Sequence, residues 1–236
     1  MLRRAIVVAL FAVVPLSLFG LLMPRKPTPE EQKAIAKYAL HINKLLNQFR
    51  GAEWTEKIDF ELTDTMVNPD SNRPLDITEL FQRTYDARTT SPRYKKLIVP
   101  MVRKMEKEKD TAEKHLQNAL IEDLLHVRVQ VNNNVLVSTL HPGPGKKNAV
   151  NVPGAIAAYK DEDNRYGYGS SYVLLFGNPK AIKWDPASLY FYYYFAHPPN
   201  SPFIENVEIR IYGADDRIQQ LLRKVDWKEV NLALTP

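Results

Sequence analysis

The chain has 236 residues, of which 44% are hydrophobic, 10% aromatic and 25% charged, and its net charge is +5. These proportions are typical of a folded chain and exclude an intrinsically disordered one. Because cysteine is absent, the sequence offers no disulfide, no thiolate nucleophile and no cysteine metal ligand.

Residues 5–23 form an apolar run of nineteen residues without a charge. A helix that crosses the bilayer's hydrocarbon layer of about 30 Å needs roughly 20 apolar residues, so this run is just long enough. A cleaved signal peptide has a shorter apolar region, of roughly 7–15 residues, followed by small residues. Here Pro24, Arg25 and Lys26 follow the run. We therefore predict an uncleaved transmembrane signal anchor over residues 1–23, with a cleaved signal peptide as the alternative.

The orientation of this anchor is predicted from the lengths of its two flanks. Basic residues occur on both sides, so the positive-inside count is nearly balanced. The N-terminal flank has four residues, and a short basic N-terminus usually stays in the cytosol. We expect a single-pass protein of the inner (cytoplasmic) membrane. Residues 24–29 would form a proline-rich neck, and residues 30–236 a domain in the periplasm or an equivalent extracytoplasmic space.

A helix is predicted directly after the neck. Thr28 and Glu31 have the spacing of a capping box, Pro29 suits the first helical position, and Gly51 is a stop signal. Between these signals, apolar residues recur at steps of three and four, which predicts one buried stripe. The stripe comprises Ile35, Tyr38, Ile42, Leu45, Leu46 and Phe49.

In the next segments, apolar residues recur in some places with the period of two that is typical of strands and in others with the period of about 3.6 that is typical of helices. Alternating apolar residues predict a strand over residues 54–66. Asp76 and Glu79 form a second capping box, which predicts a short helix through Arg88. A third helix is predicted from residue 91 to about residue 125, with a kink at Pro100.

The second half of the chain is mostly strand-like. Residues 125–131 alternate apolar and polar side chains, residues 132–134 are asparagines suited to a turn, and residues 135–140 are predicted to return as the next strand. Further strands are predicted at residues 171–176, 189–196 and 207–212, and a terminal helix at residues 215–225. Because strands mostly follow strands, the predicted fold is α+β, with an antiparallel sheet of about five or six strands and helices packed on one face.

A run of aromatic residues marks the predicted strand at residues 189–196. Tyr190, Tyr192 and Tyr194 would share one face of this strand, since side chains alternate along it. One interpretation is a central strand covered on both sides. The other is an exposed tyrosine face, together with Trp184, that recognises a protein or a sugar.

Residues 93–109 carry a local charge of +5, because seven basic residues face only Glu106 and Glu108. This pattern is typical of a solvated helix face, and it would also suit a docking surface for anionic lipid or an acidic protein. The basic residues are Arg93, Lys95, Lys96, Arg103, Lys104, Lys107 and Lys109.

No complete catalytic or metal motif is present in the sequence. The five histidines form no H-E-x-x-H pair, and no serine has glycines two residues away on both sides. His141 and His197 both precede proline at the ends of predicted strands, and they are the one histidine pair whose positions would allow a contact at one rim of the sheet; separate placement in loops is the favoured interpretation. We therefore predict no catalytic residue, no metal site and no cofactor.

These observations favour a membrane-anchored, non-enzymatic, protein-binding domain outside the cytoplasm. An accessory subunit of an envelope complex, or a toxin-immunity or inhibitor protein, would fit this description. The expected partners are the membrane, through the single span, and another envelope protein, and no nucleic acid is expected. The predicted partner-binding residues are Tyr190, Tyr192, Tyr194, Trp184, Arg93, Lys95, Lys96, Arg103 and Lys104.

Two other function classes stay open. An envelope hydrolase could assemble its acid-base residues from separate loops without leaving a local motif. A peripheral adaptor could lay the basic segment at residues 93–109 on anionic lipid or on nucleic acid.

Overall fold

A computed structural model describes much of the chain after residue 23. The described residues are 24–50, 54–60, 66–69, 71–77, 81–87, 96, 99–100, 103, 125–133, 135–136, 149–161, 170–187 and 190–236.

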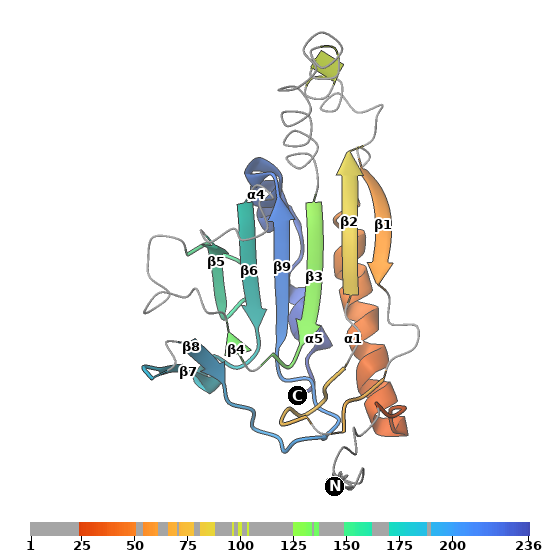
Figure 1. Ribbon diagram of the computed structural model, residues 1–236, viewed down its shortest axis with the longest axis vertical. Helices are drawn as coiled ribbons and strands as arrows, with labels where there is room; N and C mark the ends of the chain where they lie inside the picture. The colour runs from red at the N-terminus through yellow and green to blue at the C-terminus, as the bar shows by residue number, and fades with distance from the viewer. Residues whose placement is uncertain are drawn as a thin grey trace, which may run out of the picture.

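Six strands form one antiparallel sheet in the spatial order β1-β2-β3-β9-β6-β5 (Figure 1). β9, the last of the described strands in sequence, lies between β3 and β6 near the middle of the sheet. It joins a meander, β1-β2-β3, to a hairpin, β5-β6, and so completes the sheet. The strands are β1 (Trp54–Phe60), β2 (Phe81–Ala87), β3 (Leu125–Val131), β5 (Ala157–Asp161), β6 (Ser170–Phe176) and β9 (Val207–Gly213).

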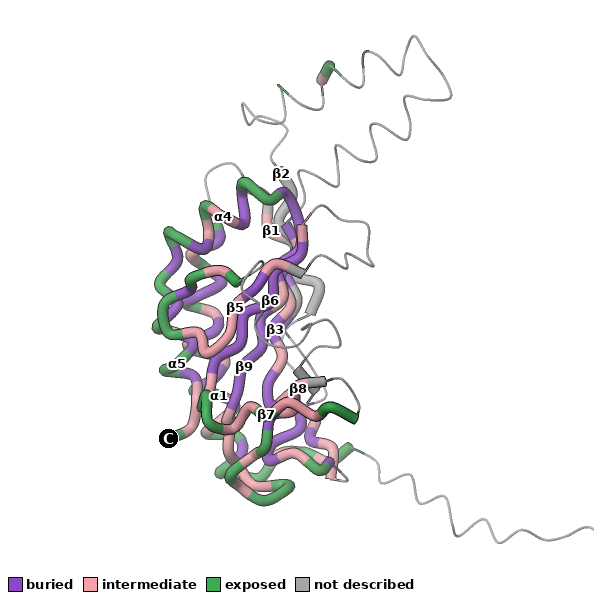
Figure 2. The backbone as a smooth tube through the Cα atoms, turned by 90° about the vertical axis from the view of Figure 1, so that its left-hand side faces the viewer, coloured by how far each residue is buried: buried purple, intermediate pink, exposed green. Residues whose placement is uncertain are grey.

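Three helices pack on one face of this sheet: α1 (Pro29–Asn47), α4 (Asp215–Lys224) and α5 (Lys228–Ala233). Figure 1 shows them behind the strands, and Figure 2 shows buried residues concentrated between helices and strands. Alternate residues of β3 and β9, such as Val127 and Ile209, are 0% exposed and belong to the core on this side. The alternation predicted for residues 125–131 is therefore confirmed, as is the α+β class, whereas in β9 the residues on the other face, such as Glu208, are also buried.

Trp227 lies at the centre of the core and is 0% exposed. Its ring centroid is 5.9 Å from that of Phe49 and 6.3 Å from that of Phe176, and its Nε1 donates to the Leu222 carbonyl at 3.1 Å. Burial of a side chain this large stabilises the fold by about 3 kcal/mol. One residue thus connects the end of α1, strand β6 and helix α4.

A second, three-stranded sheet has the order β4-β8-β7, with β4 (Val135–Leu136), β7 (Ile182–Asp185) and β8 (Tyr190–Tyr193). A 3-10 helix, η2 (Pro179–Ala181), leads into β7. Tyr193 packs against Leu175, which points away from the helices because its neighbours Leu174 and Phe176 lie in the main core. The small sheet therefore covers part of the large sheet's other face, at the lower end of β6 in Figure 1.

The predicted first helix is confirmed at its start and ends sooner than expected. Glu31 N donates to Thr28 Oγ1 at 3.3 Å and Thr28 N to Glu31 Oε2 at 2.7 Å, so the capping box forms. The helix ends at Asn47, with Gln48 as its C-cap. Gly51, the predicted stop, lies outside the described residues.

The prediction of a second capped helix was wrong, because residues 81–87 form strand β2. Asp76 does not cap a helix; its carboxylate binds Arg73 Nη2 at 2.6 Å. A capping box stabilises a helix by only about 1 kcal/mol, and β2 gains hydrogen-bonded ladders with both β1 and β3. Phe81 also reaches the core, with its ring centroid 5.6 Å from that of Tyr38 on α1.

The predicted hairpin at residues 132–134 was also wrong in its pairing. Asn132 does adopt the expected left-handed backbone, with φ of 47°. The strand that follows, β4, has two described residues and pairs with β8 instead of returning along β3. Strand β3 is already paired on both sides, by β2 and β9, so β4 has no free edge to join there.

Several described elements were not predicted, among them strand β5, the 3-10 helix η2, strand β7 and helix α5. Strand β7 lies within the segment predicted as the loop between the two aromatic strands, and α5 follows the predicted terminal helix. The strands predicted at residues 171–176 and 207–212 and the helix at 215–225 are confirmed as β6, β9 and α4.

Two predicted segments fall largely outside the described residues. The anchor over residues 1–23 is one of them, and among the described residues no helix is long and apolar enough to span a bilayer. The third helix, at residues 91–125, is the other; its described residues Lys96, Val99, Pro100 and Arg103 are helical. In the neck, Arg25 exchanges two backbone hydrogen bonds with Val67, of 2.9 and 2.8 Å.

Candidate functional site

Charged and polar side chains gather on the face of the large sheet that points away from the helices. They come from β3 and β9, whose apolar residues point to the other side. Because the two strands are antiparallel neighbours, these polar residues face one another in three cross-strand pairs. We call this set the polar face: His126 opposite Tyr212, Arg128 opposite Arg210, and Gln130 opposite Glu208.

The central pair places two arginines directly opposite each other on neighbouring strands. Residues directly opposite each other on antiparallel strands have Cβ atoms about 5 Å apart, and like charges in such positions destabilise the sheet. Both Arg128 and Arg210 carry a guanidinium cation, so the pair places two positive charges at one point of the sheet. An anion nearby would offset this repulsion.

Glu208 supplies that anion for Arg210 only. Its carboxylate is 1% exposed, its Oε1 accepts from Arg210 Nε, and its Oε2 accepts from Asn133 Nδ2 at 3.0 Å. Burial by itself would lower the pKa of Arg210, but the attraction of Glu208 and the contact with Tyr212 outweigh it and hold that pKa above its ordinary value. The Glu208–Arg210 pair is thus satisfied within the fold.

No residue that the structure describes supplies such an anion to Arg128. Its Nε is buried and makes no hydrogen bond with any residue that the structure describes. The side chain as a whole is half-buried. A buried donor left without an acceptor costs about 1–3 kcal/mol, and more when the donor is charged. Unpaired among the described residues, the Nε of Arg128 therefore lowers the stability of the fold.

Aromatic rings border the arginine pair at one end. The rings of His126 and Tyr212 meet edge to face, with centroids 5.8 Å apart, and Tyr212 is only 9% exposed. This contact fixes the two side chains beside the guanidinium groups. The polar face is thus held on β3 and β9, two strands that are each paired on both sides.

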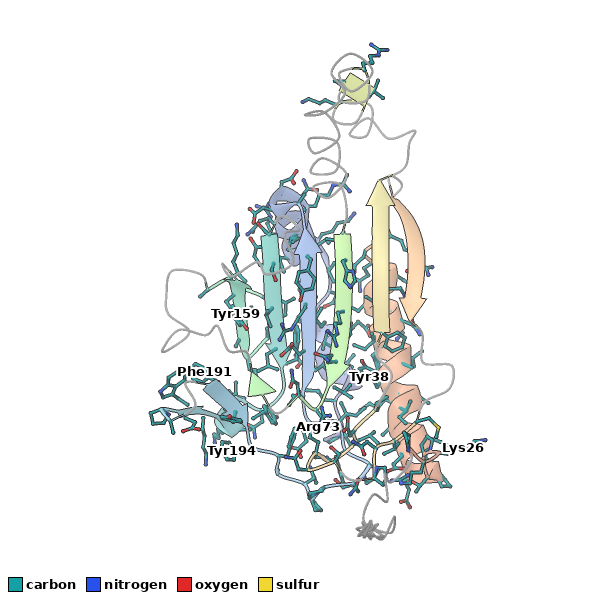
Figure 3. The ribbon with its side chains drawn as sticks, in the orientation of Figure 1. Lys26, Tyr38, Arg73, Tyr159, Phe191 and Tyr194 are labelled. Atoms are coloured by element: carbon teal, nitrogen blue, oxygen red, sulfur yellow. The ribbon has the colours of Figure 1, made fainter. Side chains whose placement is uncertain are left out.

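The predicted aromatic residues lie on the small sheet, away from the arginine pair. Trp184 on β7 packs against Phe191 on β8, with centroids 4.8 Å apart. Tyr194 is 52% exposed, and Lys183 Nζ lies 4.9 Å from the centre of its ring. Figure 3 shows Phe191 and Tyr194 on this sheet. Tyr192 is half-buried, and the side chain of Tyr190 lies outside the described part of the chain.

Strand β8 combines the two interpretations offered from its sequence. It is the central strand of its sheet, and Tyr193 is 3% exposed, with its hydroxyl donating to the Glu205 carbonyl at 3.0 Å and accepting from Asn178 N at 3.0 Å. Tyr194 follows the strand and is exposed. We define the aromatic surface as Lys183, Tyr192 and Tyr194, which share one face of the small sheet, whereas Trp184 and Phe191 lie on its other face with the buried Tyr193.

The structure brings few of the other predicted site residues together. Lys96 and Arg103 are exposed, whereas Arg93, Lys95 and Lys104 lie outside the described residues, as does His141. His197 Nδ1 lies 3.0 Å from Glu205 Oε1, and its ring stacks on Phe203 at a centroid distance of 3.6 Å.

The Glu205 carboxylate also accepts the backbone N–H groups of Ala196 and His197, at 2.9 and 2.8 Å. These bonds fix the turn after β8, so a structural role accounts for the histidine contact. No group of three or more His, Asp or Glu side chains among the described residues is placed to hold a metal ion.

The arginine pair was missed because its signal is split between distant parts of the chain. Each half is visible in the sequence, as HVRVQV in residues 126–131 and VEIRIYG in residues 207–213. Nothing in either half shows that the two strands are neighbours. A search for charged residues at the polar positions of amphipathic strands would have found both arginines. It would not have shown that they lie opposite each other on neighbouring strands.

Comparison with known proteins adds no family to this description. No protein-family model matches the chain, and no curated protein and no solved structure matches it at a significant level.

Proposed function

We propose that the chain is a non-enzymatic, protein-binding domain, anchored in the membrane by residues 5–23 and directed to the extracytoplasmic side. An accessory subunit of an envelope complex, or an inhibitor or immunity protein against a toxin, would have these properties. The observation that carries the proposal is the aromatic surface of the small sheet.

That surface has the composition of a binding hot spot. Tyrosine and tryptophan supply large contact areas at a low cost in side-chain entropy, and they are enriched where proteins bind one another. Among the described residues, Tyr194 is one of three large hydrophobic side chains that are exposed, and the cation of Lys183 lies over its ring. The surface thus combines apolar area, hydrogen-bonding tips and a positive charge.

Strand β7 offers a second mode of contact. It is an edge strand, because only β8 pairs with it among the described strands. An extended segment of a partner could therefore add to the sheet beside Trp184 by backbone hydrogen bonds. The side chain of Asp185 caps the following turn by accepting Ala187 N at 2.9 Å, so the end of this edge is well defined.

A site-specific crosslinking experiment tests the proposal. A photoreactive phenylalanine derivative replaces Tyr194 in the full chain, which is then irradiated in its native membranes. We expect a discrete crosslinked product of fixed mass, because position 194 would lie in the interface. The matched control places the same derivative at Leu232, which is also 52% exposed but lies on α5.

The contrast between the two positions decides the outcome. A product at position 194 that is absent at position 232 supports the aromatic surface as the interface. Equal products at both positions, or none at position 194, would refute it.

A further inference from the structure

Arg128 is the one side chain of the polar face whose charge the described fold leaves without an anion. Arg210 and Glu208 neutralise each other, and both Glu208 oxygens already accept hydrogen bonds. The central pair and Glu208 therefore carry one positive charge in excess.

The position of Arg128 makes a purely structural role difficult to sustain. It lies on β3, the third strand of six, where the side chain points to the face away from the helices. Its buried Nε has no acceptor among the described residues, and the guanidinium directly opposite repels it. Folded proteins accept such local conflicts mainly at functional sites.

We propose that the polar face binds an oxyanion, a carboxylate or a phosphate group of a small solute, with Arg128 as its principal ligand and Arg210 as the second cation. The planar guanidinium offers parallel N–H donors that match two oxygens of such a group. The bound anion would satisfy the buried Nε and offset the repulsion between the two arginines. The edge-to-face rings of His126 and Tyr212 would border it on one side.

This inference is independent of the proposed function. It rests on the polar face of the large sheet, whereas the proposed protein interface rests on the aromatic surface of the small sheet. Either can fail while the other stands.

Thermal unfolding of the purified full chain in detergent tests the site. The probes are inorganic phosphate and acetate, each compared with chloride at the same ionic strength. We expect at least one of the two oxyanions to raise Tm above its value in chloride, because a ligand that binds only the folded state stabilises it. The oxyanion that raises Tm more, phosphate or acetate, indicates whether the natural ligand group is a phosphate or a carboxylate.

Arg128→Met is the decisive variant, since methionine keeps much of the side chain's length and removes its charge. We expect Tm in chloride to rise above that of the unsubstituted chain, because an unpaired donor and a like-charge contact disappear. The oxyanion response should vanish, with phosphate or acetate binding weakened roughly tenfold or more in a calorimetric titration. Arg223→Met, at an exposed arginine on α4, is the control and should keep the full response.

A second variant keeps the test valid if methionine disrupts folding. Arg128→Lys retains the positive charge but loses the parallel N–H donors of the guanidinium. Most of the increase in Tm with phosphate or acetate should therefore be lost while the chain stays folded. The proposal is overturned if neither oxyanion exceeds chloride in the unsubstituted chain. It is also overturned if either Arg128 variant responds as fully as the control.

Discussion

Asn132 joins three segments of the chain through a single buried amide. Its Nδ2 donates to the carbonyls of Leu75 and Phe203, both at 2.9 Å, and its Oδ1 accepts from Glu205 N at 2.8 Å. Its backbone has φ of 47°, a conformation that asparagine tolerates better than most residues do. Because the side chain is 0% exposed, water cannot replace these bonds.

Replacement of Asn132 by alanine should therefore be strongly destabilising. We expect Asn132→Ala to lower the free energy of unfolding by about 2–4 kcal/mol, since buried carbonyl and N–H groups lose their partners. Urea-induced unfolding followed by circular dichroism measures this change.

Asn200 provides a matched control for backbone strain. It also has positive φ, of 61°, but it is exposed. Asn200→Ala should cost only about 1 kcal/mol, the preference for the left-handed conformation. Equal losses in the two variants would show that strain, rather than the amide network, makes Asn132 important.

At the level of elements, the start of α1 is tied to the neck by one carboxylate. Glu31 closes the capping box and also receives two hydrogen bonds from Arg25, each of 2.6 Å. Arg25 is itself joined to Val67 through its backbone. The hydrogen bonds from Arg25 are the main reason that the pKa of Glu31 lies below its ordinary value, although burial opposes the shift.

This arrangement predicts a pH-dependent contribution to stability. Because the pKa of Glu31 is lower in the folded state than in the unfolded chain, its contribution is complete above the ordinary glutamate pKa and is lost as the pH falls through the lowered value. We expect Glu31→Gln to cost about 1–2 kcal/mol near neutral pH. Denaturant unfolding across a pH series should show the two proteins converging in acid.

Glu30, an exposed acid in the same first turn, is the control. Glu30→Gln should cost less than about 0.5 kcal/mol, through the helix dipole alone. A gap between Glu31→Gln and the unsubstituted chain that stays constant down to strongly acidic pH would contradict this account.

At the level of the whole molecule, the position of β9 determines the architecture. The strand enters late in the sequence and pairs with both β3 and β6, so the large sheet depends on contacts between distant segments. It also supplies half of the polar face and, through Ile209 and Ile211, part of the core beneath. The site and the fold are thus completed by the same strand.

The predicted anchor leads to an expectation for the full chain. If residues 5–23 span the bilayer, the hydrogen bonds between Arg25 and Val67 hold the domain next to the membrane. We expect the full chain to stay in the membrane pellet after alkaline carbonate extraction, as detected by immunoblotting. The double variant Leu10→Arg, Val13→Arg should be extracted instead, because each arginine at mid-span costs about 2.5–3.5 kcal/mol.

Release of the unsubstituted chain by carbonate would show that the segment does not remain in the bilayer. That result would support the cleaved signal peptide and remove the membrane tether from the proposed function, while leaving the oxyanion site untouched.

Local sequence patterns determined the elements whose signals are short-range. The capping box of Thr28 and Glu31 located α1, and the alternation of apolar and polar residues located β3. These patterns depend on residues within one or two turns, or on one strand, so they could be recognised from the sequence alone. They also predicted the α+β class and an antiparallel sheet with helices on one face.

Only the tertiary structure decided which strands are neighbours. Despite the local capping signal at Asp76, residues 81–87 form a strand, β2, which pairs with β1 and β3. Strand β4 pairs with β8 because β3 is already paired on both sides. The opposition of Arg128 and Arg210 likewise exists only because β9 lies beside β3. Strand pairing is set by burial and hydrogen bonding between segments far apart in the chain, and no local period or cap records that choice.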